Sequence, residues 1–540
     1  MDFANIPLPE KFFNTAGPNQ PDIHYTIDPL SRINMQEIEM LLAQRKYFVL
    51  HAPRQTGKTS MLLTLRDYLN RQGRYFCVYV NVEPGQAARN NVASAISAIC
   101  ELLADRIDIL LGGREYNKIY EEMFKPKDSN SRLSSFLTYL SESFGKPFIL
   151  LIDEIDSLVG DSLVSVLRQL RSGYEQRPAL FPSSIILCGV RDVRDYRIVL
   201  SNQDIITGGS AFNIKAESLR MGNFSKEEIR ALYQQHTDNT GQIFDEECFP
   251  MIWNATEGQP WLVNALGYEV TYKLDGVRDR SVKIIPEMIY KAQEQIICRR
   301  DTHIDILIDK LKEPRVRNVI QPLLAAEENF DENQIPYDDL QYCIDLGLVA
   351  QNKPVRIANN IYREVIPREL TWTTQYRIIQ EPAWYLNPDN SLNMEKLLMD
   401  FQQFFRQNSD SWIGSFDYAE AGPQLLLQAF LQRIVNGGGY IDREYGIGRG
   451  RTDLLIRKPL TNQYGGPFQR IVLELKIQRN TLEKTIEAGL QQTYGYMDRV
   501  GDVSEGHFII FNRSKNKSWD EKIFHRKEEY RGREITVWGM

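Results

Sequence analysis

The segment from Ala52 to Ser60 constrains the fold of this chain more than any other. Residues 47–50 form an apolar run before it, which predicts a short buried strand, and residues 61–69 follow it with the apolar spacing of a helix. A strand, a tight loop and a helix in this order are the context that a phosphate-binding loop requires. In that arrangement the backbone N–H groups of the loop and the positive end of the helix dipole converge on one anion site.

The residues of this loop have separate expected roles. Lys58 should reach the β- and γ-phosphates of a nucleotide, and the hydroxyl of Thr59 should hold Mg²⁺. The usual pattern begins with Gly, whereas this chain has Ala52, whose methyl group fits if its φ is not positive. A polar strand-to-helix loop with a chance Gly-Lys-Thr is the alternative. The other loop residues expected to bind the nucleotide are Pro53, Arg54, Gln55, Thr56, Gly57 and Ser60.

Size and composition favour a soluble protein of several domains. The chain has 540 residues, of which 42% are hydrophobic and 25% charged, and its net charge of −7 means that any nucleic-acid contact must come from a local patch. The six cysteines and six histidines are scattered without metal-ligand spacing, which favours free thiols in a reducing cytosol. No apolar run reaches the roughly 18 residues of a membrane span, and the N-terminus lacks a signal-peptide pattern. We therefore expect a cytoplasmic protein without membrane contact.

A pair of acidic residues completes the pattern that the loop begins. Residues 147–152 predict a third buried strand, after a second one at residues 75–82, and Asp153 and Glu154 follow directly. Asp153 is expected to orient Mg²⁺, usually through water, and Glu154 to polarise the attacking water. The alternative is that the acidic pair only caps the N-terminus of a helix.

A fourth predicted strand, residues 184–190, ends at two arginines. Arg191 and Arg194 are placed where a cation can sense the γ-phosphate or neutralise charge in the transition state. Salt bridges with Asp192 and Asp195 are the alternative role for the same side chains.

Helical patterns at residues 224–241 and 249–274 predict a lid, in which Gly258 and Pro260 stand at the start of a helix and Pro260 is expected beside the nucleotide. Together with the loop and the acidic pair, this pattern resembles the AAA-like and STAND-type P-loop ATPases over about residues 20–370. The resemblance implies a parallel sheet with helices on both faces, a helical lid, often a winged helix, and ATP with Mg²⁺ as ligands. Assembly into a homo-oligomer stays open, because no trans-acting arginine finger is recognisable. Control by a protein trigger stays open as well.

The middle of the chain predicts a winged-helix-like region. A helical pattern ends at Gly347, and two short strands are expected around Val349 and residues 355–357. Such modules bind DNA in some proteins. The helix here carries three aspartates, which repel phosphate, so a structural or protein-contact role is favoured.

Two predicted strands near the end of the chain, residues 451–456 and 470–476, carry a second group of acidic residues. Asp453 lies on the first strand and Glu474 on the second, and side-chain alternation puts Lys476 on the same face as Glu474. Two carboxylates can hold Mg²⁺ or Mn²⁺, and the lysine can activate a water molecule or stabilise developing charge. Cross-strand salt bridges would produce the same pattern.

A helix at residues 482–499, with Gln492 and Tyr496, and a buried strand at residues 506–511 follow these strands. The pattern resembles the PD-(D/E)xK nuclease superfamily, in its branch with a Gln-x-x-x-Tyr helix, over about residues 395–540. The resemblance implies an α/β restriction-endonuclease-like fold in which the two carboxylates and the lysine are catalytic.

The same resemblance assigns supporting roles. Gln492 and Tyr496 should flank the active site near the substrate phosphates, and Glu444, on an earlier strand, should be an accessory metal ligand. Many such folds also use a glutamate on the first helix, where this chain has Gln424, with Glu420 just before it. The expected domains are an ATPase core with its N-terminal arm at 1–215, a lid at 216–300, a winged-helix-like region at 301–370, a linker at 371–394 and a nuclease-like domain at 395–540.

Basic and aromatic residues are interleaved between residues 515 and 533. This composition is typical of a patch that contacts a phosphate backbone, although the acidic residues among them are equally typical of a solvated face.

The leading hypothesis is an ATP-controlled, metal-dependent nuclease of the bacterial cytosol. Its nucleic-acid partner is expected to be DNA rather than RNA, and family analogy adds a role in defence against foreign DNA. One alternative is a STAND-like switch whose C-terminal domain only binds nucleic acid or a protein. Another is a DNA translocase with a vestigial nuclease fold.

Overall fold

The computed structural model describes most of the chain, and the chain forms two compact units that are taken separately below. The first unit comprises Met1–Phe249, Gly258–Ile284 and Asp345–Gly347, and the second comprises Pro250–Glu257, Ile285–Ile344 and Leu348–Met540. The described residues are 10–192, 197–200, 205–207, 212–299, 302–325, 335–370, 382–413, 422–435, 440–445, 452–461, 466–478, 481–514 and 516–540.

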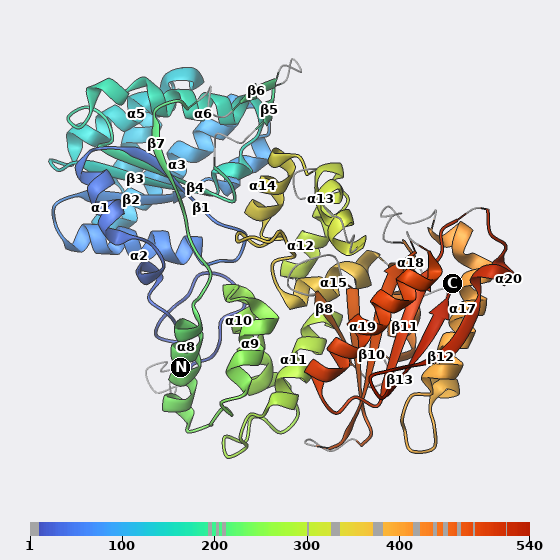
Figure 1. Ribbon diagram of the computed structural model, residues 1–540. Helices are drawn as coiled ribbons and strands as arrows, with labels where there is room; N and C mark the ends of the chain where they lie inside the picture. The colour runs from blue at the N-terminus through green and yellow to red at the C-terminus, as the bar shows by residue number, and fades with distance from the viewer. Residues whose placement is uncertain are drawn as a thin grey trace. The chain divides into compact units, whose positions relative to one another are not determined.

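The first unit is built on a five-stranded sheet in the order β2-β3-β4-β1-β7 (Figure 1). Every neighbouring pair of strands is parallel, so the carboxyl ends of all the strands lie at one edge of the sheet. The segments that follow β1, β3 and β4 therefore meet at that edge, as the predicted site requires. The strands are β1 Tyr47–His51, β2 Phe76–Asn81, β3 Phe148–Asp153, β4 Ser184–Gly189 and β7 Lys215–Arg220.

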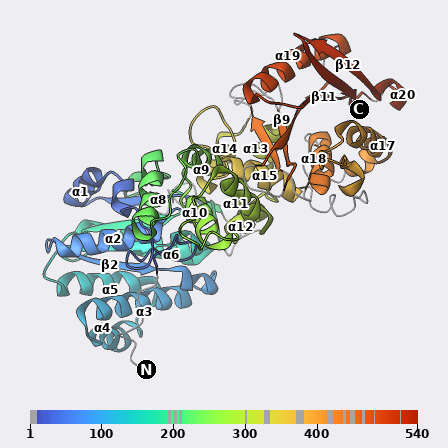
Figure 2. The ribbon, with the colours of Figure 1, turned by 90° about the horizontal axis from the view of Figure 1, so that it is seen from below.

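Helices cover both faces of this sheet, which explains why its strands are continuous apolar runs. Tyr47 and Val49 point into a core made with α3, α5 and α6, whereas Phe48 and Leu50 point into a second core made with α1 and α2. Figure 2 shows this layering, with α3 and α5 on one side of the sheet and α1 on the other. The helices are α1 Met35–Ala43, α2 Lys58–Arg71, α3 Val92–Leu111, α4 Glu115–Ile119, α5 Ser129–Ser143 and α6 Gly160–Ser172. A short hairpin, β5 Arg197–Val199 and β6 Ile205–Thr207, is also present.

The N-terminal arm packs on the lid helices of the first unit. Phe13 is fully buried, and its ring lies 5.0 Å from that of Tyr25 and 4.8 Å from that of Tyr233. The indole of Trp261 also donates a hydrogen bond to the carbonyl of Thr15 at 2.9 Å. The arm therefore holds the lid as well as the nucleotide domain. The lid helices of this unit are α8 Lys226–Thr240 and α10 Pro260–Tyr268, whereas most of α9 Cys248–Thr256 belongs to the second unit.

Local contacts set two of the helix boundaries. The helix α1 begins at Met35, because Asn34 caps it by accepting a hydrogen bond from the backbone of Glu37. The helical pattern at residues 249–274 is divided between α9 and α10, and α10 begins at Pro260, where a helix start was predicted. Glu257 and Gly258 have positive φ values of 44° and 74° there, which no α-helix accommodates.

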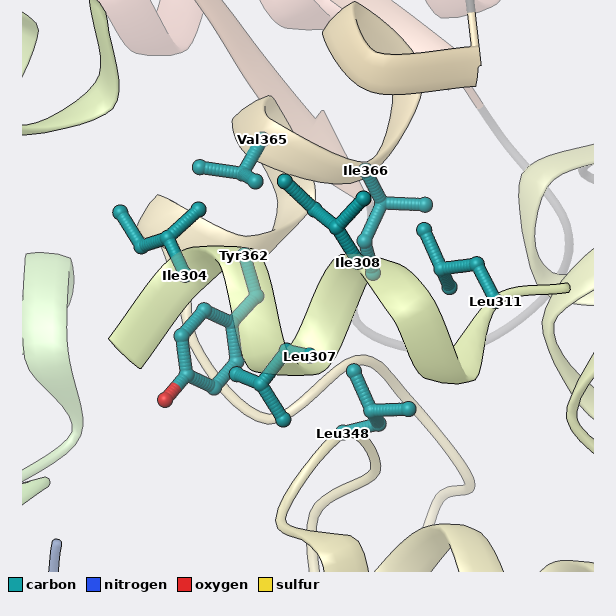
Figure 3. Close-up of a pocket in the computed structure, with 8 residues that line it drawn as sticks. All are labelled: Ile304, Leu307, Ile308, Leu311, Leu348, Tyr362, Val365 and Ile366. Carbon is teal, nitrogen blue, oxygen red and sulfur yellow. The ribbon is translucent and has the colours of Figure 1, made fainter. Parts of the chain in front are cut away.

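The second unit begins with helices. The helices α12 and α13 are separated by a turn before Pro314. A bridge between Val349 and Ile357 is the short antiparallel pairing expected after α14. Apolar side chains of α12 and α15, together with Leu348, line a small pocket without polar lining atoms (Figure 3). The helices are α11 Pro286–Arg299, α12 Thr302–Lys310, α13 Pro314–Ala325, α14 Tyr337–Leu346 and α15 Asn360–Leu370.

A mixed six-stranded sheet in the order β12-β13-β11-β10-β9-β8 forms the rest of the second unit. The helix α19 lies across one face, where Val472 and Phe508 pack beneath it (Figure 1). On α17, Phe405 packs on Phe511 of β11, with the ring centroids 5.4 Å apart. The strands are β8 Tyr440–Tyr445, β9 Thr452–Pro459, β10 Phe468–Ile477, β11 Glu505–Phe511, β12 Phe524–Tyr530 and β13 Arg533–Gly539. The helices are α17 Met394–Ile413, α18 Gly422–Val435, α19 Leu482–Val500 and α20 Trp519–Lys522.

Two expectations from composition can be compared with the fold. All six cysteines are free, as predicted, and only Cys298 is exposed. Within the described ranges, no helix combines the length and apolar character that crossing a bilayer demands.

The break between α9 and α10 yields a stability prediction. A Cβ atom on Gly258 would lie 2.0 Å from the carbonyl oxygen of Phe224, and the residue has a φ of 74°. Gly241 has a similar φ of 78° but open space around it. Gly241→Ala should therefore cost only the left-handed backbone, about 1 to 2 kcal/mol, while Gly258→Ala should cost roughly 1 to 3 kcal/mol more because of overlap. Thermal unfolding of the two full-length variants compares them, and equal melting temperatures would contradict the prediction.

Candidate nucleotide site and acidic strand row

The loop after β1 has the backbone that phosphate binding needs. Gln55 and Gly57 have positive φ values of 56° and 90°, and Gly57 lies directly before the first turn of α2. Ala52 is fully buried, does not have a positive φ, and donates its N–H to the carbonyl of Gly189 at 3.3 Å. The replacement of the usual first glycine by Ala52 is thus compatible with the loop.

Lys58 lies buried at the start of α2 and turns back onto the loop. Its Nζ donates to the carbonyl oxygens of Ala52 and Pro53 at 3.1 and 3.0 Å. The buried Thr56 closes the same turn, because its Oγ1 donates to the Pro53 carbonyl at 2.8 Å. Arg54 is exposed, and Ser60 accepts a hydrogen bond from the N-terminal arm. The ammonium group is therefore held inside the concave side of the loop, where an anion would be bound.

The structure brings the two predicted magnesium ligands of this site together. Thr59 Oγ1 donates to Asp153 Oδ2 at 2.7 Å, and Asp153 is fully buried. The hydroxyl of Tyr79 donates to the same oxygen at 3.0 Å, and the backbone N–H of Glu154 donates to Asp153 Oδ1 at 3.0 Å. A hydroxyl and a carboxylate side by side are oxygen ligands of the kind that Mg²⁺ binds. These residues therefore fit the metal.

Tyr79 was not predicted from the sequence, although a weak signal for it exists. It lies on β2, whose Asn81 pairs with Asp153 of β3, so Tyr79 is two residues before the acidic end of the sheet. Burial and the adjacent Asp153 raise the pKa of Tyr79, so its hydroxyl keeps its proton and remains a donor.

Glu154 has an unusual backbone and an unusual environment. Its φ and ψ are 56° and 40°, and its side chain makes no capping hydrogen bond to the turn that follows, so the helix-cap alternative does not apply to it. Burial raises the pKa of the Glu154 carboxyl; Lys58 opposes this shift, and Asp156 and Asp153 add to it. A left-handed non-glycine residue costs roughly 1 to 2 kcal/mol, and such strain is typical of functional positions.

The predicted arginine sensors are described only in part. Arg191 directly follows the segment after β4, at the same edge of the sheet as Asp153, and is half-buried. Arg194 and Asp195 lie outside the described residues, so their expected roles stay predictions.

The lid approaches the loop through Gln259, which directly precedes Pro260. Pro260 is buried and is the first residue of α10. The side chain of Gln259 caps α10 by accepting from the backbone of Leu262 at 2.6 Å, and its Nε2 lies 3.5 Å from the carbonyl oxygen of Gln55. Gln259 is therefore a contact between lid and loop that the sequence did not predict.

Arg32 is a second residue of this site that the sequence did not predict. Its guanidinium donates to the carbonyl of Thr56 at 2.6 Å and to the carbonyl of Gly222, and it lies 4.7 Å from the ring centroid of Phe224. Burial lowers the pKa of Arg32 to about 10. One charged side chain therefore joins the phosphate loop to the segment that leads into the lid.

Comparison with known proteins places this site in a family. A model described as the AAA-like domain matches residues 28–366. The chain belongs to this AAA-like family. The match covers the loop, the acidic pair and the lid, and with the parallel sheet it identifies a P-loop ATPase.

Solved structures and curated proteins add little. The Walker-type ATPase PABY2304 of Pyrococcus abyssi has a TM-score of 0.46 at 15% identity, covering 66% of this chain and 99% of that chain. Cdc6p from Pyrobaculum aerophilum has a TM-score of 0.34 at 15% identity, and the match covers 63% of this chain and 93% of that chain. The Thermotoga maritima RuvB Holliday junction branch migration motor has a TM-score of 0.32 at 12% identity, and the match covers 62% of this chain and 95% of that chain. The comparison with curated proteins returned no match.

In the second unit, strand register aligns three acidic positions. Asp453 on β9 pairs directly with Glu474 on β10 and with Glu444 on β8, and both strand pairs are antiparallel. Directly opposed residues of antiparallel strands share a face, so these positions form a row. Lys476, two residues beyond Glu474, shares that face. Glu444, Asp453 and Glu474 are called the acidic row below.

Glu474 is an unusual member of the acidic row. It is fully buried, and neither carboxylate oxygen has a hydrogen-bond partner within the described ranges. A buried carboxylate without donors is strongly unfavourable unless a cation satisfies it, so Glu474 fits a metal ligand. Lys476 is 9% exposed. The side chains of Asp453 and Glu444 are not described, and the described side chains include no cluster of three His, Cys, Asp or Glu residues suited to a metal.

The helix α19 places the two predicted flanking residues over the same face. Gln492 is half-buried, and its Oε1 is buried without a partner in the described part of the chain. Tyr496 is fully buried in the apolar core beneath α19. On α18, Gln428 is fully buried with its amide oxygen and nitrogen equally unsatisfied among described residues. Gln428 was not among the site residues predicted from the sequence. The side chains of Gln424 and Glu420 are not described.

The Asp153 hydrogen bonds predict a role for Tyr79 in metal use. Tyr79→Phe removes a donor that orients the carboxylate, and loss of such a supporting contact costs about 10- to 100-fold in metal affinity or activity. The Mg²⁺ concentration for half-maximal ATP hydrolysis should rise accordingly, while nucleotide binding without metal is retained. Tyr75→Phe is the matched control, since Tyr75 lies in the same core. An unchanged Mg²⁺ dependence in Tyr79→Phe would contradict this role.

The raised pKa of Glu154 predicts how the rate of ATP hydrolysis falls at low pH. A carboxyl whose pKa lies above 4.5 becomes protonated at a higher pH than usual, so hydrolysis should fall as the pH drops through that raised value. Asp156→Asn removes a negative neighbour and should move this decline to lower pH. Measurement of kcat against pH at saturating ATP tests both points, and identical profiles would contradict them.

Proposed function

We propose that this AAA-like ATPase uses its nucleotide state to control a metal-dependent nuclease in its second unit, acting on DNA in preference to RNA. The observation that carries the nuclease half is the acidic row, in which a fully buried Glu474 lacks hydrogen-bond partners among the described residues and pairs in register with Asp453. If this row were purely structural, hydrogen-bond donors would be expected around such a buried carboxylate.

At the nucleotide site, each residue has a task that follows from its position. Lys58 exchanges its hydrogen bonds to two loop carbonyls for bonds to phosphate oxygens. Thr59 and Asp153 hold Mg²⁺, which supplies electrostatic stabilisation of the phosphates. Glu154, held in its strained conformation above Asp153, orients and polarises the attacking water.

At the acidic row, Glu474 and Asp453 hold Mg²⁺ or Mn²⁺, with Glu444 as an accessory ligand. The metal supplies Lewis-acid stabilisation of a phosphodiester. Lys476 lies on the same face and stabilises the charge that develops when water attacks phosphorus. Gln492 and Tyr496, from α19, flank this site near the substrate phosphates. By family analogy, we propose that the activity serves defence against foreign DNA.

A cleavage assay tests this proposal. The purified full-length chain is incubated with single- and double-stranded DNA and RNA, with Mg²⁺ or Mn²⁺, and with or without ATP. Cleavage of DNA that changes with ATP supports the proposal. Binding without cleavage under every metal condition would favour the STAND-like switch, and DNA-stimulated ATP hydrolysis without cleavage would favour the translocase.

Substitution in the acidic row predicts a separation of the two activities. Glu474→Gln keeps the shape of the side chain but removes its charge, and loss of metal catalysis worth several kcal/mol lowers cleavage by at least about 100-fold. ATP hydrolysis should be retained. Glu483→Gln, an exposed residue of the first turn of α19, is the matched control. Cleavage that survives in Glu474→Gln would remove the acidic row from the mechanism.

A substitution in the phosphate loop tests control by nucleotide. Lys58→Ala should abolish ATP binding, and Glu154→Gln should bind ATP without hydrolysing it. If ATP controls cleavage, the two variants should differ in nuclease activity, because only one of them reaches the ATP-bound state. Retained hydrolysis in both variants would remove the assignment of this site.

A further inference from the structure

Two tyrosines and two arginines of the second unit form a cluster beside α19. The rings of Tyr494 on α19 and Tyr530 on β12 meet edge to face, 5.7 Å apart. The guanidinium of Arg531 lies 5.7 Å from the Tyr494 ring centroid and 5.6 Å from that of Tyr530, and Arg533 lies 6.0 Å from Tyr494. These four residues are called the arginine–tyrosine cluster.

The two arginines of the cluster differ from the other basic residues of the same hairpin. Arg526 pairs with Glu528 at 2.8 Å, and Lys527 pairs with Glu534 at 2.8 Å. Arg531 and Arg533 have no carboxylate partner among the described residues. Aromatic faces hold each guanidinium in place without neutralising its charge or occupying its N–H groups, which leaves those groups to bind an anion.

The cluster lies on the same face of the sheet as the acidic row. Tyr494 and Tyr530 pack against the apolar core beneath α19, and Val472 of that core is two residues before Glu474 on β10. Side chains two residues apart on a strand share a face. Because α19 packs over the strands between the two groups, a DNA strand that meets both passes outside that helix.

Strand register gives the distance between the two groups. Glu474 pairs with Phe508, Phe508 with Val537, and Val537 with Arg526 of β12. The cluster residue Tyr530 is four residues farther along β12. Three strand spacings across and four residues along amount to about 20 Å.

We propose that the arginine–tyrosine cluster contacts the phosphate backbone of the DNA strand that the acidic row cleaves. Arg531 and Arg533 donate bidentate hydrogen bonds to phosphate oxygens, and the tyrosines fix the two guanidinium planes. The contact is independent of base sequence. The inference rests on the nuclease function proposed above for the substrate, but the cluster binds DNA without metal or catalysis.

A binding experiment with a matched control tests the cluster. Affinity of the full-length chain for a 20-nucleotide single-stranded DNA is measured in EDTA by fluorescence anisotropy over a range of salt. Arg531→Ala with Arg533→Ala should weaken binding at least about 10-fold and reduce the slope of log affinity against log salt by about 1.4. Arg526→Ala with Lys527→Ala removes the same charge from the same hairpin, where carboxylates already neutralise it, and should have a smaller effect.

Cleavage assays separate this inference from the proposed function. Equal loss in the two double variants, unchanged affinity in the cluster variant, or a loss confined to RNA would each overturn the inference, whether or not the chain cleaves DNA. Weakened DNA binding in the cluster variant, without cleavage by the native chain in any metal, would support the contact and remove the nuclease.

Discussion

The hydrogen bond between Thr59 and Asp153 is the interaction on which the nucleotide site depends. It joins the first turn of α2 to the end of β3, and so brings together two segments that are 94 residues apart in the chain. Both residues can take these positions only because β1 and β3 are parallel members of one sheet whose carboxyl ends share an edge. The site is therefore a consequence of the sheet order, and the buried carboxylate is stable because three donors surround it.

The parts of the site that the sequence predicted correctly are those determined by local pattern. Apolar runs located β1, β3 and β4, and the polar residues directly after each run were placed at the correct edge. Arg32, Tyr79 and Gln259 were missed because their roles depend on contacts between segments far apart in the chain. For Arg32, no pattern of neighbouring residues indicates that its side chain reaches a loop 24 residues away.

The start of α10 was predicted from Gly258 and Pro260, but the backbone conformation before it was not. The interruption between α9 and α10 contains Glu257, a residue with ordinary helix propensity, in a left-handed conformation. Tertiary contact decides this conformation: the carbonyl of Gly258 accepts a hydrogen bond from the backbone of Phe224, and only a glycine fits against that segment. Arg32 donates to Gly222 in the same segment. The same segment, from Gly222 to Phe224, thus contacts both Gly258 at the start of the lid helix and Arg32, which binds the phosphate loop. The local sequence could not reveal these contacts.

The two candidate sites differ in how their buried carboxylates are stabilised. In the first unit Asp153 is buried with three hydrogen-bond donors, so the carboxylate is stable before any metal arrives and serves to position it. In the second unit Glu474 is equally buried, yet the described residues offer its oxygens no donor. Because an isolated buried carboxylate either binds a cation or gains a proton, occupancy of this site should be coupled to a divalent ion.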